Sequence, residues 1–103
     1  MIRPAIHECQ DMAQVRQHID ALDARIVPLL AERSAYVAQA GRIKQRADQV
    51  HDQARIDFIV ARVTAMARAL GAPEAVVEAT YRAMIDASIE FEHGEFARLH
   101  PEA

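Results

Sequence analysis

The stretch RQHIDALDARIVPLLAER, residues 16–33, places apolar side chains at steps of three and four along the chain. That spacing is typical of one face of an α-helix, and it continues on both sides, so it predicts one helix from about Asp11 to about Ala47. Pro28 removes one backbone hydrogen bond, but the pattern keeps its phase there, so we expect a bend rather than a break. The apolar stripe consists of Met12, Val15, Ile19, Leu22, Ile26, Leu29, Leu30, Val37, Ala40 and Ile43.

Two further helices are predicted after a polar stretch. Asp52 suits the N-cap of the second helix, and Gly71 suits its C-terminal stop. Pro73 fits the first turn of the third helix. The inner face of the third helix consists of Val77, Tyr81, Met84, Ile85, Ser88, Glu92 and Phe96. The sequence therefore predicts an all-α fold of three helices with a long first helix.

The predicted first helix is too long for one small domain. A helix of about 36 residues is about 54 Å long, whereas a compact chain of about 100 residues is only about 35 Å across. Another chain is needed to cover the overhanging stripe, so we expect an intertwined homodimeric helical bundle. Residues 1–103 are predicted to form a single helical domain with its core at about residues 12–98, and residues 1–10 and 99–103 are expected to be mobile.

Composition excludes several classes of protein. The chain has 103 residues, 51% of them apolar, which is too many for a disordered segment. A net charge of -3 without a basic run argues against nucleic acid as a partner. No stretch approaches the roughly 20 apolar residues of a membrane span. Cys9 is the only cysteine, and no signal-peptide core is seen, so we expect a reducing, cytoplasmic location.

Polar side chains fall on the inner faces of all three predicted helices. Arg33 and Lys44 are 11 residues apart, so they share a helix face to within about 20°. Ser88 and Glu92 are an i,i+4 pair, and Arg55 lies in the first turn of the second helix. Buried charges are costly unless they are paired. We expect a polar pocket for a small, multiply anionic molecule, which would itself be the negative partner of Arg33 and Lys44.

Each of these residues, considered alone, could have an ordinary structural role. Arg33 could form a buried ion pair with Glu32 or Glu92. Lys44 could extend its ammonium group to solvent at the end of the helix.

Other candidate sites are weaker. Glu90 and His93 form an E-x-x-H motif, but a di-iron bundle needs a second copy, so no metal site is expected. Cys9 has no organised base nearby in the sequence, which argues against a nucleophilic role. The histidines are scattered, and we expect them to be solvated: His7, His18, His51, His93 and His100.

Residues 16–33 resemble the opening helix of the all-helical (type II) chorismate mutases, which carries an arginine, I-D-x-L-D and a Leu-rich turn ending in A-E-R. The lysine of GRIK (residues 41–44), the motif DQAR (52–55) and the segment MIDASIEFE (84–92) also match. The resemblance covers about residues 12–98. It implies an intertwined dimer of three-helix chains with two active sites and no cofactor.

The resemblance also implies how a dicarboxylate substrate would be bound. Arg33 and Arg55 would hold its two carboxylates together with Arg16 of the partner subunit. Helix length agrees with this assignment, because Arg16 lies about 42 Å along the helix from Lys44, too far for one small molecule to touch both.

The remaining implied roles concern the reaction. Lys44 would bond the ether oxygen of the enolpyruvyl group, and Glu92 would face the same oxygen. Asp52 and Ser88 would contact the ring hydroxyl region. Lys44, Glu92 and Arg33 are the expected catalytic residues, and the rearrangement of chorismate to prephenate requires no nucleophile, metal or base.

Two departures from the family pattern leave alternatives open. Glu92 replaces a glutamine and would help only when protonated, which burial favours and nearby cations oppose. Ile56 replaces a glutamate, as in the related isochorismate-pyruvate lyases, and the stretch from Lys44 to Arg55 is about one residue short. We therefore predict a chorismate mutase of aromatic amino-acid biosynthesis, with an isochorismate-pyruvate lyase of salicylate or siderophore synthesis as the alternative. A mutase of amino-deoxychorismate and a non-catalytic dimeric helical binding module also remain possible.

Overall fold

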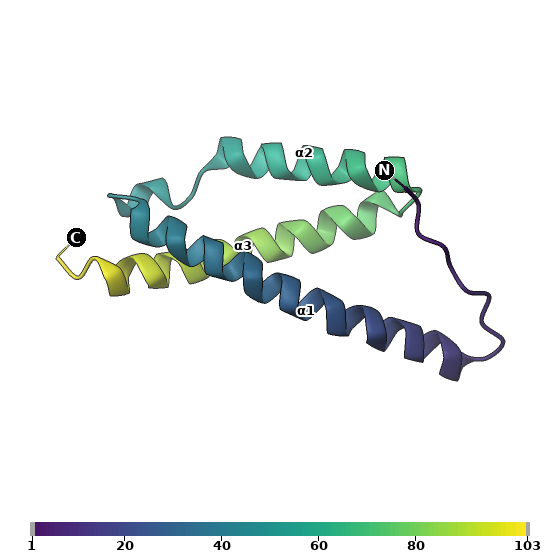
Figure 1. Ribbon diagram of the computed structural model, residues 1–103. Coiled ribbons are helices and arrows are strands. Elements are labelled where there is room, and N and C mark those ends of the chain that lie inside the picture. The colour runs from purple at the N-terminus through teal and green to yellow at the C-terminus, as the bar shows by residue number, and fades with distance from the viewer. Residues whose placement is uncertain (1, 103) are drawn as a thin grey trace.

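The computed structural model describes residues 2–102, and helices are the only regular elements within them (Figure 1). The three α-helices confirm the predicted all-α fold with a long first helix. Their bounds, with one short 3-10 helix, are α1 Met12–Ile43, η1 Ala47–Gln49, α2 Gln53–Leu70 and α3 Glu74–Leu99.

Helix ends are set by local side-chain and backbone chemistry. An Asp11 carboxylate oxygen accepts a hydrogen bond from the backbone of Gln14 at 2.8 Å, which caps α1. Asp52 caps α2 in the same way, as predicted. Gly71 ends α2 in the left-handed region at φ 69°, where glycine has no side chain to clash. Pro73 lies immediately before α3 rather than in its first turn.

The predicted C-terminus of α1 was wrong by about one turn, because the helix ends at Ile43 instead of about Ala47. The cause is the side chain of Gln49. Its Oε1 accepts hydrogen bonds from the backbone N–H groups of Gln45 and Arg46 at 2.9 and 3.1 Å. Those donors are therefore satisfied without continuing the helix, and the chain turns into η1.

α1 continues through Pro28 as one helix of 32 residues. It crosses α3, and its N-terminal half projects away from α2 and α3 (Figure 1). The chain is consequently elongated, with extents of 59 × 25 × 19 Å and a radius of gyration of 17.2 Å. A compact chain of this length has a radius of gyration of about 13 Å.

The projecting half of α1 leaves apolar side chains uncovered. Ile19 is 51% exposed, Ile26 is 48% exposed and Leu29 is 62% exposed. Since burial of such side chains stabilises a fold by about 1.5–3 kcal/mol each, this surface is suited to contact with another chain.

A small core lies along α3. Its buried apolar side chains are Val50, Val60, Val63, Ala67, Ile85 and Phe96. α1 lies close to α3 at Gly41, where an added Cβ atom would lie 3.3 Å from the backbone oxygen of Glu92. The absence of a side chain at this position permits that approach.

Terminal mobility stays a prediction. Residues 1 and 103 lie outside the described part of the chain, residues 2–10 form no helix or strand, and Leu99 is still helical. None of the helices in residues 2–102 combines the length and apolarity needed to cross a membrane.

Alanine substitutions at two helical glycines test the close approach. Alanine favours a helix over glycine by about 0.8–1.0 kcal/mol. At Gly94 an added Cβ meets nothing within 4 Å, so Gly94→Ala is expected to raise the free energy of unfolding by about 0.5–1 kcal/mol. At Gly41 the contact with α3 offsets that gain, so Gly41→Ala is expected to be at least about 1 kcal/mol less stable than Gly94→Ala. Urea denaturation measures both, and equal stabilisation would contradict the close approach.

Candidate functional site

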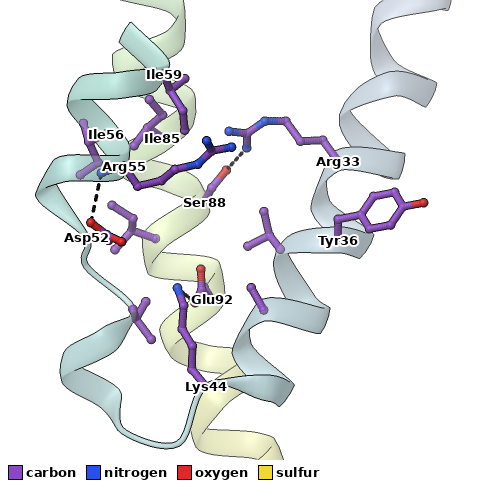
Figure 2. Close-up of a pocket in the computed structure, with 14 residues that line it drawn as sticks. Arg33, Tyr36, Lys44, Asp52, Arg55, Ile56, Ile59, Ile85, Ser88 and Glu92 are labelled. Atoms are coloured by element: carbon purple, nitrogen blue, oxygen red, sulfur yellow. Dashed lines mark hydrogen bonds and ion pairs between the residues drawn. The ribbon is translucent and has the colours of Figure 1, made fainter.

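A cavity of about 430 Å³ lies between α1 and α2, with α3 beneath it (Figure 2). Its charged lining comprises three cations and two carboxylates. Six of the seven residues predicted for the site line it: Arg33, Lys44, Asp52, Arg55, Ser88 and Glu92. The structure thus brings together side chains from three helices that are far apart in the sequence.

Two guanidinium groups converge at one end of the cavity. Figure 2 shows Arg33 and Arg55 pointing toward each other from α1 and α2. Arg33 Nη1 donates a hydrogen bond to Ser88 Oγ at 3.1 Å. None of the ion pairs within residues 2–102 involves either arginine. Two facing cations without a carboxylate between them repel, so this end of the cavity favours an anion.

Arg55 is also held from outside the cavity. Its guanidinium carbon lies 5.3 Å from the centre of the Phe58 ring, a favourable cation–π contact. Sequence reasoning missed Phe58, although its i,i+3 spacing from Arg55 places the two side chains on one helix face.

The other end of the cavity holds a closely paired lysine and glutamate. Lys44 Nζ lies 2.7 Å from Glu92 Oε2, and the side chains are 28% and 9% exposed. The prediction that the substrate, and no residue of the chain, would be the negative partner of Lys44 is therefore wrong. A buried carboxylate is costly without compensation, and the ammonium group at the end of α1 compensates it. The suggested pairing of Arg33 with Glu32 or Glu92 is likewise wrong, because none of the ion pairs within residues 2–102 involves Arg33, which donates to Ser88 instead.

Asp52 has a structural role as well as a place in the cavity. Its Oδ1 accepts a hydrogen bond from the backbone N–H of Arg55 at 3.0 Å, which caps α2. The cap fixes the first turn of α2 and therefore the backbone from which the Arg55 side chain extends.

The remaining surface of the cavity is apolar. Branched aliphatic side chains line it between the two polar ends: Val37, Val50, Ile56, Ile59, Ile85 and Ile89. Tyr36 borders the cavity, but its ring points away from it (Figure 2). An apolar middle with polar ends fits a small ring that carries anionic groups.

Residues 15–93 match the family described as chorismate mutase type II. The chain belongs to this family. A search among curated proteins returns no match for the chain. Membership confirms the resemblance seen in the sequence, and it indicates a chorismate mutase-type function for a site that binds a small molecule.

Arg16 is the one residue predicted for this chorismate mutase-type site that does not line the cavity. It is exposed on α1, 17 residues before Arg33, which corresponds to about 26 Å along the helix. Its own chain therefore cannot bring it to Arg33 without breaking α1.

His100 differs from the expectation that all histidines are solvated. Its ring is half-buried and stacks on Phe96 with 4.4 Å between ring centres.

In this member of the type II chorismate mutase family, no three His, Cys, Asp or Glu side chains within residues 2–102 gather as metal ligands would.

Substitution of Asp52 tests its role as the cap of α2. Asp52→Ala removes the cap acceptor and is expected to lower the free energy of unfolding by about 0.5–2 kcal/mol. Asp52→Asn keeps an oxygen acceptor and is expected to stay within about 0.5 kcal/mol of the wild type. Urea denaturation distinguishes them, and an equal loss in both variants would show that the charge, not the cap, stabilises α2.

Proposed function

We propose that this protein is a chorismate mutase that rearranges chorismate to prephenate. The observation that carries the proposal is the convergence of Arg33 and Arg55 on one end of a cavity whose other end holds Lys44 and Glu92. Chorismate is a ring with two carboxylates and an ether oxygen, so it offers an acceptor to each end.

Binding would begin with the arginines. Guanidinium groups form charge-assisted hydrogen bonds to carboxylates, often in pairs, and each arginine would hold one carboxylate. The aliphatic residues between the two ends would then confine the ring and the enolpyruvyl side chain to the folded conformer from which the reaction proceeds. This confinement converts a rare conformer into the bound one.

The rearrangement needs no covalent participation by the protein. The ether C–O bond breaks while a new C–C bond forms within the same molecule, and negative charge grows on the ether oxygen. The Lys44 ammonium group would donate to that oxygen and stabilise the charge as it develops. To do so it has to share or release its contact with Glu92, which lies at 2.7 Å.

Glu92 would contribute as a hydrogen-bond donor. A protonated carboxyl can donate to the ether oxygen, whereas an ionised one would repel the growing negative charge there. The protonation of Glu92 therefore sets whether it helps or opposes the reaction.

We also propose that the working enzyme is an intertwined homodimer in which Arg16 of the partner subunit completes each site. The uncovered apolar surface of α1 supports this, as does the distance along α1 between Arg16 and the cavity of its own chain. A cytoplasmic location, favoured by the single Cys9, and a role in aromatic amino-acid biosynthesis belong to the same proposal.

A second candidate is an isochorismate-pyruvate lyase. The observation in its favour is Ile56, which gives the cavity an apolar side chain where the mutases usually carry a glutamate. An elimination that releases pyruvate from isochorismate would use the same arginines and the same lysine.

Incubation of the purified protein with chorismate and, separately, with isochorismate tests the proposal. Prephenate from chorismate is expected, whereas salicylate and pyruvate from isochorismate would instead support the lyase. Arg33→Ala is expected to lower kcat/KM by about a hundredfold or more, because a charge-assisted contact to the substrate is lost. Arg82→Ala, at an exposed arginine of α3, is the matched control and should leave kcat/KM within about twofold. Turnover of neither substrate would contradict both candidate functions.

Substitution of Glu92 tests its role as a donor. Glutamine keeps the length of the side chain and always donates from its amide group. Glu92→Gln is therefore expected to retain or raise kcat with chorismate, whereas Glu92→Ala, which has no donor, is expected to lower kcat about tenfold or more. Steady-state kinetics at saturating chorismate measure both variants. An equal kcat in the two variants would rule out this role.

Mixed dimers test the sharing of arginines. Arg16→Ala and Arg33→Ala, each expected to be inactive alone, are unfolded and refolded together. Each mixed dimer then has one site with both arginines, so random pairing should restore about a quarter of wild-type activity.

The control mixture combines Arg33→Ala with Lys44→Ala. Both residues line the cavity of one chain, so every site in such a mixed dimer lacks one of them and no activity should return. Equal recovery in the two mixtures would overturn the assignment of Arg16 to the partner subunit.

A further inference from the structure

The C-terminal end of α1 is fastened to α3 by His100. The ring nitrogen Nε2 of His100 lies 3.2 Å from the backbone oxygen of Gly41 and 3.1 Å from that of Arg42. Both partners are carbonyl groups, which only accept, so Nε2 carries the hydrogen and donates it to both. One imidazole thereby satisfies two carbonyls that the end of a helix leaves without partners.

The imidazole is itself held in place. It stacks on the ring of Phe96, one turn earlier on α3, with 25° between the ring planes. Phe96 is only 4% exposed, so its ring position is set by the core. The backbone N–H of His100 donates to the Phe96 oxygen at 2.9 Å, which fixes the end of α3.

The fastened segment leads directly into Lys44. Gly41 and Arg42 form the last turn of α1, and Lys44 is the C-cap, whose backbone N–H donates to Ala40 at 3.0 Å. Beyond it the chain leaves the helix, with ψ 143° at Lys44. The last turn of α1 is therefore the helical segment from which the Lys44 side chain extends into the cavity.

We propose that His100 is a positioning residue for Lys44: by donating to the carbonyls of Gly41 and Arg42, it holds the last turn of α1 against α3 and aims the ammonium group into the cavity. This inference rests on the proposed function for its effect on catalysis. His100 lies outside the cavity lining, so it acts through Lys44 and does not touch the substrate. His100 would thus affect the reaction although it lies beyond residues 15–93, which match the family.

Two variants separate the hydrogen bond from the ring packing. His100→Phe keeps an aromatic ring against Phe96 but has no donor. His100→Gln loses the ring but keeps an N–H group at a similar distance from the backbone. If the donor is what matters, His100→Gln should behave like the wild type and His100→Phe should not.

The first measurement is the steady-state kinetics of the full-length variants with the substrate that the wild type converts. For His100→Phe we expect kcat to fall about tenfold while KM stays within about twofold, because Lys44 acts on the transition state and the arginines still bind the carboxylates. For His100→Gln we expect both values within about twofold of the wild type. Unchanged kinetics in His100→Phe, a loss confined to KM, or an equal loss of kcat in both variants would each overturn the proposal.

The second measurement is independent of any reaction. Amide hydrogen exchange of Lys44 reports on the last turn of α1, and that of Val63, buried in α2, reports on the rest of the fold. In His100→Phe we expect the Lys44 amide to exchange about tenfold faster with Val63 unchanged, and in His100→Gln we expect wild-type rates at both. If the wild type converts neither substrate, the proposed function fails and this measurement alone decides the positioning role. Wild-type exchange at Lys44 in His100→Phe would refute it.

Discussion

Within the part of the chain that the structure describes, the architecture depends on α3, the one helix that contacts both of the others. Within residues 2–102, α1 and α2 do not bring any Cα atoms within 8 Å of each other, whereas each packs on α3. The space between α1 and α2 is therefore kept open by the residues of α3 beneath it. Ser88 and Glu92 lie there, one helical turn apart, and each meets a cation from α1. The spacing of a single helix thus sets the separation between the two ends of the cavity.

Much of the fold could be predicted because its signals are local. The N-cap at Asp52 and the stop at Gly71 depend on a few neighbouring residues, so the sequence alone locates both ends of α2. The phase of the apolar stripe correctly predicted that α1 continues through Pro28. The end of α1 could not be predicted, because the side chain of Gln49 competes for backbone donors that a longer helix would also satisfy. Nothing in residue spacing decides such a competition.

The sequence predicted which residues line the candidate site, but it did not predict which of them contact each other. Helical periodicity placed Arg33 and Lys44 on one face, and both do line the cavity. The pairing of inward-facing acids with cations depends on the axial position of α1 relative to α3. Helical periodicity does not determine that position. Among residues 2–102, the structure pairs Lys44 with Glu92 and pairs Arg33 with the hydroxyl of Ser88. The two ends consequently differ, because Lys44 is paired with Glu92 at one end and the arginines at the other end are suited to an incoming anion.

The short connection between α2 and α3 has a consequence for the order of folding. Only Gly71, Ala72 and Pro73 separate these helices, whereas the contact of Arg33 with Ser88 spans 55 residues and that of Lys44 with Glu92 spans 48. Chain-closure entropy rises with sequence separation, so the α2–α3 hairpin is expected to form before α1 docks. The cavity is then the last feature to assemble. Undocking of α1 would dismantle the cavity, because Arg33 and Lys44 would separate from Ser88 and Glu92.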